Sequence, residues 1–353
     1  MAVITVAGSG MMGTAITFPA AANGHRIRLV GTPLDREIID HARATGEHKT
    51  LKRRLPEGYE LYQFEELSCA LEGSDLLVCG VSSFGVDWFC ENVLPSVPET
   101  LPVLSVTKGM MNEGEGRMIS YPEYMCRVAE TFGKHPDISA VGGPCTSYEL
   151  ADSDPTEVAF CGRNIERLRW LKALFETDIY HVSLSTDVRG VECAVALKNA
   201  YALAVSLAIG MSYAREGGRE IEHYNSQAAL FGQSLREMSR LLKAFGGGAD
   251  NIFLGAGDLY VTVFGGRTRR IGTLLGTGLS FDEAMSRLQG VTLESIVITG
   301  RTTKAVREGI ALGALNPDDF PLLLHIDSLI NDGARVNIPW KMFETETELA
   351  ANV

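Results

Sequence analysis

The chain has 353 residues, which is enough for two domains that each bury a core of ordinary size. Hydrophobic residues make up 45% and charged residues 22% of the chain, a balance typical of globular proteins. The net charge of −12 argues against a nucleic-acid-binding protein, which needs a clustered basic face. A few convergent Lys and Arg side chains could still bind a small anionic substrate.

Seven cysteines are present, an odd number without a CxxC pair, and several lie in apolar runs such as LLVCGV. This usage is typical of a reducing compartment, where a thiol packs as a small hydrophobic group, so a cytoplasmic protein is expected. The N-terminus enters a strand-like run at once, which predicts no signal peptide. The seven histidines show no metal-ligand spacing, so no metal site is expected.

The first half of the chain alternates short apolar runs with amphipathic stretches. The runs are continuous rather than alternating in polarity, which is typical of strands covered on both faces. Two of the stretches between them, 35–44 and 164–176, have helical periodicity. This repetition predicts a doubly wound, mostly parallel α/β sheet. Its expected strands are 2–8, 26–31, 75–81, 101–107, 138–143, 156–161 and 179–184.

The composition changes after about residue 186. Ala- and Leu-rich stretches with helical periodicity replace the strand-like runs, so we predict an all-α C-terminal domain and divide the chain into domains 1–185 and 186–353. The most apolar segment, 193–210, carries two polar residues near its start, which favours a buried helix over a membrane span. The expected helices are 188–211, 224–245, 281–289, 293–312 and 317–331.

A glycine-rich turn, GSGMMG, directly follows the first expected strand and opens a helical pattern. This is the GxGxxG fingerprint of a Rossmann-type dinucleotide-binding domain in its required context. Gly8 permits the tight turn, Gly10 lets the backbone approach a pyrophosphate, and Gly13 allows close helix–strand packing. A tight turn without a ligand is the alternative interpretation. The turn's expected cofactor-binding residues are Gly8, Ser9, Gly10, Met11, Met12 and Gly13.

The end of the second expected strand leaves the choice between NAD and NADP open. An acidic residue there would bind the ribose 2′-hydroxyl, but Thr32 occupies the place and Asp35 lies three residues further on. Arg36 could bind a 2′-phosphate, although a position on a solvent-exposed helix face explains this residue better. We therefore expect Thr32 to contact the cofactor and predict NAD or NADP.

Lys198 lies in VECAVALKNAYALAVSLAIG, a stretch that is apolar on nearly every side of the expected helix. A buried lysine costs free energy through desolvation unless it has a partner or a chemical task. It could extend to the surface near a helix end. We favour a catalytic role in which Lys198 protonates a substrate carbonyl oxygen as hydride arrives. Asn199 follows directly and could orient the substrate.

A second polar cluster spans residues 255–272. Asp258 and Thr262 are four residues apart and share a face if the stretch is helical, so Asp258 could hold the lysine ammonium in place. Two glycines at 265–266 then end the helix and present a basic run at 267–270. Arginine beside exposed backbone N–H groups suits phosphate recognition, although a basic helix cap would look similar.

Lys108 follows the expected strand 101–107 at its carboxyl end. Doubly wound sheets bind ligands at that edge, so Lys108 could reach the substrate or the catalytic centre. A solvated loop lysine is the alternative.

Taken together, GSGMMG, VTKG, GGPCTSYELA, DVRGVECAVALKN, GDLYVTVFGGR and GVTLES resemble the NAD(P)-dependent glycerol-3-phosphate dehydrogenase family. The motifs occur in the family's order from residue 4 to about 331. The resemblance implies a Rossmann domain followed by a helical substrate domain. It also implies a cytoplasmic homodimer of glycerophospholipid metabolism that interconverts dihydroxyacetone phosphate and sn-glycerol 3-phosphate.

The resemblance also implies roles for individual residues. Lys198 becomes the catalytic acid/base, with Lys108, Asp258 and Thr262 in supporting catalytic roles and Asp187 near the lysine. The implied substrate-binding residues are Lys108, Asn199, Arg267 and Thr268. The implied cofactor-binding residues beyond the glycine turn are Thr32, Ser82, Phe84, Lys108, Arg267 and Glu294.

Two departures from the family pattern lie on the substrate side. The family usually has Arg-Asn in its phosphate loop where this chain has Arg267-Thr268, and its GPSFA or GANIA segment here reads GGPCTS. Two alternatives therefore stay open. One is a dehydrogenase of this scaffold acting on a longer keto-sugar phosphate or another 2-keto compound. The other is a dinucleotide-sensing protein without turnover.

Overall fold

The computed structural model of the protein describes residues 1–289 and 293–346. The chain divides into two compact units, which are described separately below. Unit 1 comprises residues 1–111, 118–196 and 245–261, and unit 2 comprises residues 112–117, 197–244 and 262–353.

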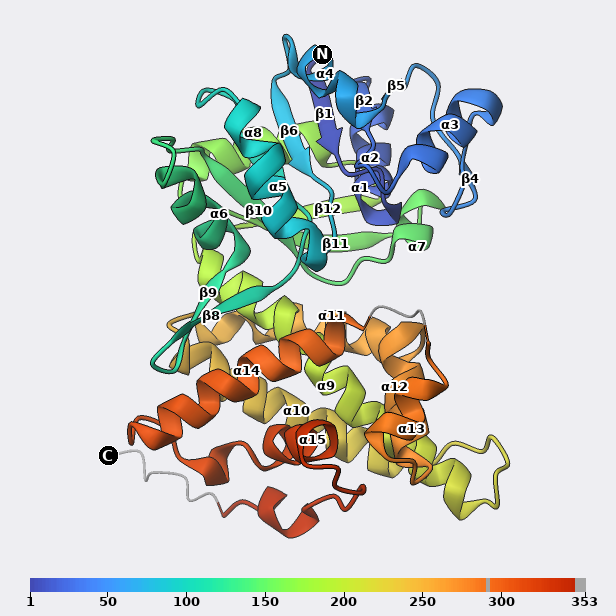
Figure 1. The fold of residues 1–353 in the computed structure, drawn as a ribbon, viewed down its shortest axis with the longest axis vertical. Helices are drawn as coiled ribbons and strands as arrows, with labels where there is room; N and C mark the ends of the chain where they lie inside the picture. The colour runs from blue at the N-terminus through green and yellow to red at the C-terminus, as the bar shows by residue number, and fades with distance from the viewer. Residues whose placement is uncertain (290–292, 347–353) are drawn as a thin grey trace. The chain divides into compact units, whose positions relative to one another are not determined.

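Unit 1 contains an eight-stranded sheet in the order β12-β11-β10-β7-β6-β1-β2-β5 (Figure 1). Neighbouring strands are parallel except for β10 and β11, which pair antiparallel. This confirms the predicted doubly wound α/β class and all seven expected strands. The strands are β1 (Val3–Ala7), β2 (Arg26–Val30), β5 (Glu60–Tyr62), β6 (Leu76–Cys79), β7 (Val103–Ser105), β10 (Ile138–Gly142), β11 (Thr156–Cys161) and β12 (Tyr180–Ser185).

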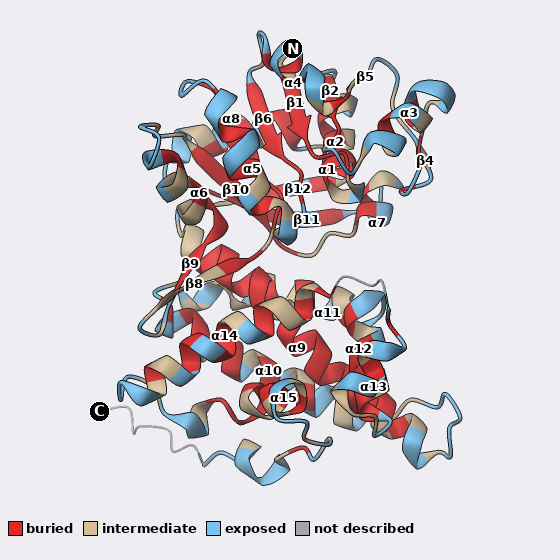
Figure 2. Ribbon diagram, viewed as in Figure 1, coloured by how far each residue is buried: buried red, intermediate tan, exposed pale blue. Residues whose placement is uncertain are grey.

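The sheet is buried on both faces because alternate residues of its central strands enter different cores (Figure 2). In β6, Leu76 and Val78 belong to one core, whereas Leu77 and Cys79 belong to the other. A strand with two buried faces needs an unbroken apolar run, as predicted. The first core includes α1 (Met11–Ala15), α2 (Thr17–Ala22) and α8 (Ile165–Phe175); the second includes α4 (Leu67–Leu71), α5 (Val86–Asn92) and α6 (Tyr121–Glu130).

The helix after β1 is interrupted at Ile16, which separates α1 from α2. Pro19 has no N–H to donate to the carbonyl of Ala15 one turn earlier, and its ring crowds that turn. The predicted helices 35–44 and 164–176 are observed as α3 (Arg36–Thr45) and α8.

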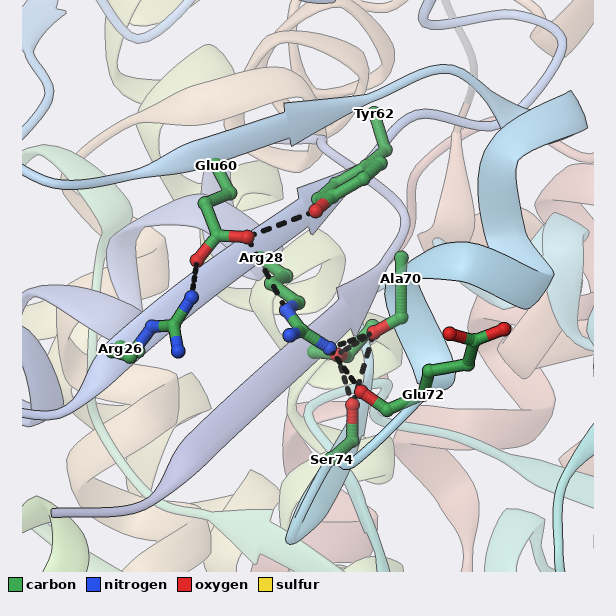
Figure 3. A network of polar contacts seen from close by, with 8 residues as sticks. Arg26, Arg28, Glu60, Tyr62, Ala70, Glu72 and Ser74 are labelled. Carbon is green, nitrogen blue, oxygen red and sulfur yellow. Dashed lines mark hydrogen bonds and ion pairs between the residues drawn. The ribbon is translucent and has the colours of Figure 1, made fainter.

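A polar network attaches the edge strand β5 to its neighbour β2 (Figure 3). The sequence analysis did not predict this strand. Glu60 of β5 accepts hydrogen bonds from Arg26 at 2.5 Å and from Tyr62 at 2.9 Å. Arg28 donates to the carbonyls of Ala70 and Glu72 at the end of α4. A cation at a helix C-terminus is electrostatically favourable, so the network connects β2 and β5 to the end of α4.

The regular secondary structure of unit 2 is helical in the described residues, apart from the strand residues that residues 112–117 contribute to the β8–β9 hairpin (Met110–Gly114, Arg117–Ser120). This confirms the predicted all-α C-terminal region. The helices are α10 (Tyr224–Ala244), α12 (Gly266–Gly276), α13 (Phe281–Ser286), α14 (Glu294–Ala311) and α15 (Pro321–Asn331). Two further helices, α9 (Val188–Arg215) and α11 (Ile252–Val263), contribute residues to both units.

Helix α9 is long and apolar enough to cross a membrane by length and composition alone. However, 89% of its most apolar window is buried inside the protein. Its composition therefore reflects a core helix, as predicted.

A buried glutamate organises the core of unit 2. Glu237 on α10 has no exposed surface and accepts four hydrogen bonds. Two come from the N–H groups of Leu322 and Leu323 at the start of α15, at 2.7 and 2.9 Å. The others come from Gln233 at 2.8 Å and Tyr201 at 3.0 Å. The side chain therefore satisfies two N–H groups that a helix start leaves without partners.

Replacing Glu237 with leucine should lower the free energy of unfolding by about 3–5 kcal/mol, because several buried donors lose their acceptor. Gln233→Leu removes only one donor from the same network and should cost less than half as much. Denaturant unfolding at neutral pH measures both values. Equal losses in the two variants would contradict this role of the carboxylate.

Candidate active site

The glycine turn after β1 packs tightly against the end of β6. Gly8 has φ +108°, and a Cβ there would lie 2.7 Å from the carbonyl carbon of Gly80. A Cβ on Gly13 would collide with the carbonyl oxygen of Gly8. Gly10 differs, because a Cβ there would meet only the Gly80 oxygen, at 3.9 Å. Internal packing thus requires Gly8 and Gly13, whereas Gly10 leaves backbone surface uncovered for a ligand.

A pocket of about 470 Å³ opens beside this turn in unit 1. It brings together five of the predicted cofactor-binding residues from three loops. Phe84 is 51% exposed and offers an aromatic surface to the pocket. Ser9 and Gly13 are buried in the turn, and Met11 and Met12 begin α1. The pocket is lined by Gly8, Gly10, Thr32, Pro33, Leu34, Asp35, Gly80, Val81, Ser82, Phe84, Gly85 and Trp88.

Asp35 is a pocket residue that the sequence analysis did not assign to the site. Its N–H donates to the carbonyl of Thr32 at 2.9 Å, which closes a turn with Pro33 at its second position. Its carboxylate accepts from the Thr32 N–H at 2.9 Å and hydroxyl at 2.8 Å. The turn therefore returns an acidic group to the end of β2, and the Thr-Pro-Leu-Asp spacing was the available signal. Arg36 is exposed and pairs with Glu65.

His48 holds the glycine turn from a second direction. The side chain is fully buried, and its Nε2 lies 2.7 Å from the carbonyl oxygen of Ser9. Its Nδ1 accepts the N–H of Leu51 at 3.0 Å, so Nε2 carries the proton and donates to Ser9. Burial lowers the pKa of His48, which favours this neutral form.

Lys108 and Asp258 form an ion pair in unit 1. The Nζ of Lys108 lies 2.5 Å from Oδ2 of Asp258 and 2.7 Å from the carbonyl oxygen of Gly143. The Asp258 side chain is 1% exposed and that of Lys108 is 18% exposed. An ammonium group has three donors, and the third has no acceptor among the residues that the structure describes. Lys108 can therefore offer one charged donor at the carboxyl edge of the sheet.

Asp187 precedes α9 and serves as its cap. Its carboxylate accepts from the Gly190 N–H at 2.8 Å, the Gly248 N–H at 2.7 Å and the Asn251 amide at 2.7 Å. This geometry gives Asp187 a structural role at the helix start.

Lys198 and Asn199 are half-buried on α9, between the buried residues Leu197 and Ala200. Thr262 is half-buried near the end of α11, one turn after Asp258. The predicted helix over Asp258 and Thr262 is therefore confirmed.

The chain leaves α11 and enters α12 through a glycine pair. Gly266 has φ +82°, a conformation that a side chain would disfavour. No side-chain hydrogen bond caps α12, so its first N–H groups lack a side-chain acceptor, and helix starts of this kind bind anions such as phosphate. Arg267 is exposed in the first turn and Thr268 is buried. Arg269 instead pairs with Glu222 at 2.5 Å.

Glu294 is the first residue of α14 and is half-buried. The preceding residues of its motif, 290–292, lie outside the described residues. Within the described ranges, no group of three or more His, Cys, Asp or Glu side chains could hold a metal ion.

Two family models match the chain in succession. The model of the NAD-dependent glycerol-3-phosphate dehydrogenase N-terminus matches residues 3–167, and that of the C-terminus matches residues 187–340. An Archaeoglobus fulgidus protein named NADP(+)-dependent glycerol-3-phosphate dehydrogenase is 32% identical over 289 residues, 81% of this chain and 84% of that protein. A Geobacillus kaustophilus glycerol-3-phosphate dehydrogenase [NAD(P)+] is 30% identical over 311 residues, 86% of this chain and 84% of that protein.

The fold is similar to those of solved glycerol-3-phosphate dehydrogenases. The Coxiella burnetii structure has a TM-score of 0.77 at 24% identity and covers 97% of each chain. The Saccharomyces cerevisiae structure has a TM-score of 0.78 at 20% identity and covers 97% of this chain and 99% of that one. At these identities the likeness shows the fold alone.

Replacing His48 with leucine should loosen the glycine turn, because Ser9 loses its donor and Leu51 its acceptor. A lost buried hydrogen bond is worth about 1–3 kcal/mol, so the dissociation constant for NADH should rise roughly tenfold or more. Fluorescence titration of NADH measures it. The exposed His135, changed to leucine, is the control and should bind as the parent does. Unchanged affinity in His48→Leu would show that the turn does not need this side chain.

Proposed function

The chain belongs to the NAD-dependent glycerol-3-phosphate dehydrogenase family, and we propose that it interconverts dihydroxyacetone phosphate and sn-glycerol 3-phosphate. When bound, NAD(P)H supplies the hydride that reduces the ketone. Residues of the chain bind the two phosphorylated molecules, orient the carbonyl group and supply the proton that completes the alcohol.

The uncapped start of α12 is the observation that best supports a phosphorylated substrate. Its free N–H groups and the Arg267 guanidinium favour a phosphomonoester by charge and hydrogen bonding. We assign the substrate phosphate to Arg267 and Thr268 and substrate orientation to Asn199.

The carbonyl oxygen of the substrate receives its proton from Lys198 in this proposal. Lys108 contributes a second charged donor, since Asp258 and Gly143 occupy only two of its three N–H groups. Thr262 is assigned a supporting role one turn beyond Asp258. The proton moves from nitrogen to oxygen while the hydride bonds to carbon, so charge and atoms balance.

The residues of the glycine turn and pocket fit a dinucleotide. Gly10 leaves the backbone uncovered, and the buried Oγ of Ser9 has no partner among the described residues. We assign cofactor binding to the turn with Thr32, Ser82 and Phe84, and to Lys108, Arg267 and Glu294 from other segments. The names of relatives include both NAD and NADP as cofactors. The negative charge of Asp35 in the pocket would repel the 2′-phosphate of NADP.

We further assign dinucleotide binding to residues 1–185 and substrate chemistry to residues 186–353. A cytoplasmic homodimer that supplies glycerophospholipid metabolism completes the proposal. Seven cysteines without a disulfide support a reducing compartment. The names of the relatives do not favour a longer keto-sugar phosphate or a sensor without turnover.

The purified chain should consume NADH or NADPH when dihydroxyacetone phosphate is added, and more efficiently than with longer keto-sugar phosphates. Lys198→Ala should retain cofactor affinity and lose roughly 10²- to 10⁴-fold in kcat, the usual contribution of a positioned proton donor. Cofactor absorbance measures turnover, and NADH fluorescence measures binding.

Turnover within threefold of the parent would contradict the assignment of Lys198. A better kcat/KM for a longer keto-phosphate would contradict the substrate, and cofactor binding without oxidation of any polyol phosphate would favour the sensor.

A further inference from the structure

Glu192 is a buried acid that the proposed chemistry does not use. It lies on α9 six residues before Lys198 and has no exposed surface. Neither carboxyl oxygen has a hydrogen-bond partner among the described residues. A buried carboxylate without donors is costly, whereas a neutral carboxyl group costs far less. Burial accordingly raises the pKa of Glu192 to about 8.

Glu237 shows how hydrogen-bond donors affect the charge state of a buried carboxyl group. That carboxyl is equally buried, but four donors stabilise its charged form. Burial raises the pKa of Glu237 to about 7, against the opposing effect of those donors. Glu192 lacks an equivalent set of hydrogen-bond donors among the described residues.

The charged groups near Glu192 are already paired with others. Lys108, in the loop after β7, favours the charged form of Glu192, but the Lys108 ammonium is bonded to Asp258. Glu123 on α6 opposes that form, and its carboxylate is paired with Arg189 at 2.5 Å. Compensation of a Glu192 charge would therefore use the remaining donor of Lys108 or require the Glu123–Arg189 pair to rearrange.

The other titratable groups around Glu192 are thiols. Cys161 of β11 and Cys193 of α9 are fully buried, and burial raises the pKa of each. Both remain neutral at physiological pH and offer no compensating charge. Glu123 and the two thiols thus supply no charge that would stabilise an ionised Glu192, whereas Lys108 does.

We propose that Glu192 is a positioning residue for Lys108. Its neutral carboxyl group leaves Asp258 as the partner of the ammonium group, so that Lys108 keeps a charged donor for the substrate. Ionisation of Glu192 adds a second negative charge beside Lys108, draws the ammonium inward and repels a phosphorylated substrate. This inference rests on the proposed function, because it assigns the substrate to Lys108.

The direct test compares KM and kcat for dihydroxyacetone phosphate in the parent and Glu192→Gln between about pH 6.5 and 9.5. The parent's KM should rise by roughly three- to tenfold as Glu192 ionises, the expected effect of a like charge at a partly solvated distance. The glutamine variant cannot ionise there, so its KM should stay flat over this step while its kcat follows the parent. Glu91→Gln, which neutralises an exposed carboxylate on α5, should reproduce the parent profile.

Denaturant unfolding over the same range and down to about pH 4 provides a readout without substrate. The folded-state pKa of Glu192 lies above its unfolded-state value near 4.5, so unfolding releases a proton between these values. The parent should therefore lose stability relative to Glu192→Gln as pH rises from about 4.5 to about 8, and the difference should level off above that.

Superimposable KM profiles in the parent and Glu192→Gln would overturn the positioning role, even if the unfolding curves show that Glu192 titrates. A constant stability difference across pH would also overturn it, because Glu192 would then not change charge. A parent without activity on dihydroxyacetone phosphate at pH 7 would overturn the proposed function and this inference with it.

Discussion

The ion pair between Lys108 and Asp258 is the interaction on which the polar arrangement of unit 1 depends. A carboxylate that is 1% exposed is tolerated because the ammonium lies 2.5 Å away. Removing either partner would leave an uncompensated buried charge, which is far costlier than the intact pair. The pair also joins the loop after β7 to α11, two segments 150 residues apart in sequence. The placement of Lys108 follows from this pairing, whereas the neutral form of Glu192 follows from its burial.

The edge of the sheet to which we assign the dinucleotide is shaped by close packing rather than by charge. Gly8 and Gly13 permit contacts that any side chain would prevent, and the turn consequently lies against Gly80 at the end of β6. His48 fixes the same turn through the carbonyl of Ser9. A rigid turn with one uncovered glycine, Gly10, is well suited to bind a dinucleotide at little entropic cost.

Much of the fold could be predicted because its signals are local. Each central strand is an unbroken apolar run, and GSGMMG identifies the first turn without knowledge of distant residues. The strand β5 was missed because Glu60 and Tyr62 make it polar, and its attachment depends on Arg26 and Arg28 of another strand. Edge strands with one solvated side lack the continuous pattern that identifies buried ones.

The site was less predictable where function depends on burial and long-range pairing. Lys198 attracted attention because it is a charge in an apolar helix, yet Glu192 meets the same criterion and was overlooked. The sequence suggested that Asp258 could hold Lys198, which stays a prediction, but it gave no sign that Lys108 is also a partner of Asp258. Asp35 reaches the pocket only through a turn, and the Ser9 contact of His48 spans 39 residues. Such contacts leave no local periodicity in the sequence.

A double-mutant cycle on the Lys108–Asp258 pair tests the account most directly. The kcat/KM for dihydroxyacetone phosphate is measured in Lys108→Met, Asp258→Asn and the double variant. If the two residues act as one unit, the double variant loses little more than either single variant, with a coupling of about 1.5–3 kcal/mol. Losses that simply multiply, with a coupling below about 0.5 kcal/mol, would contradict the account.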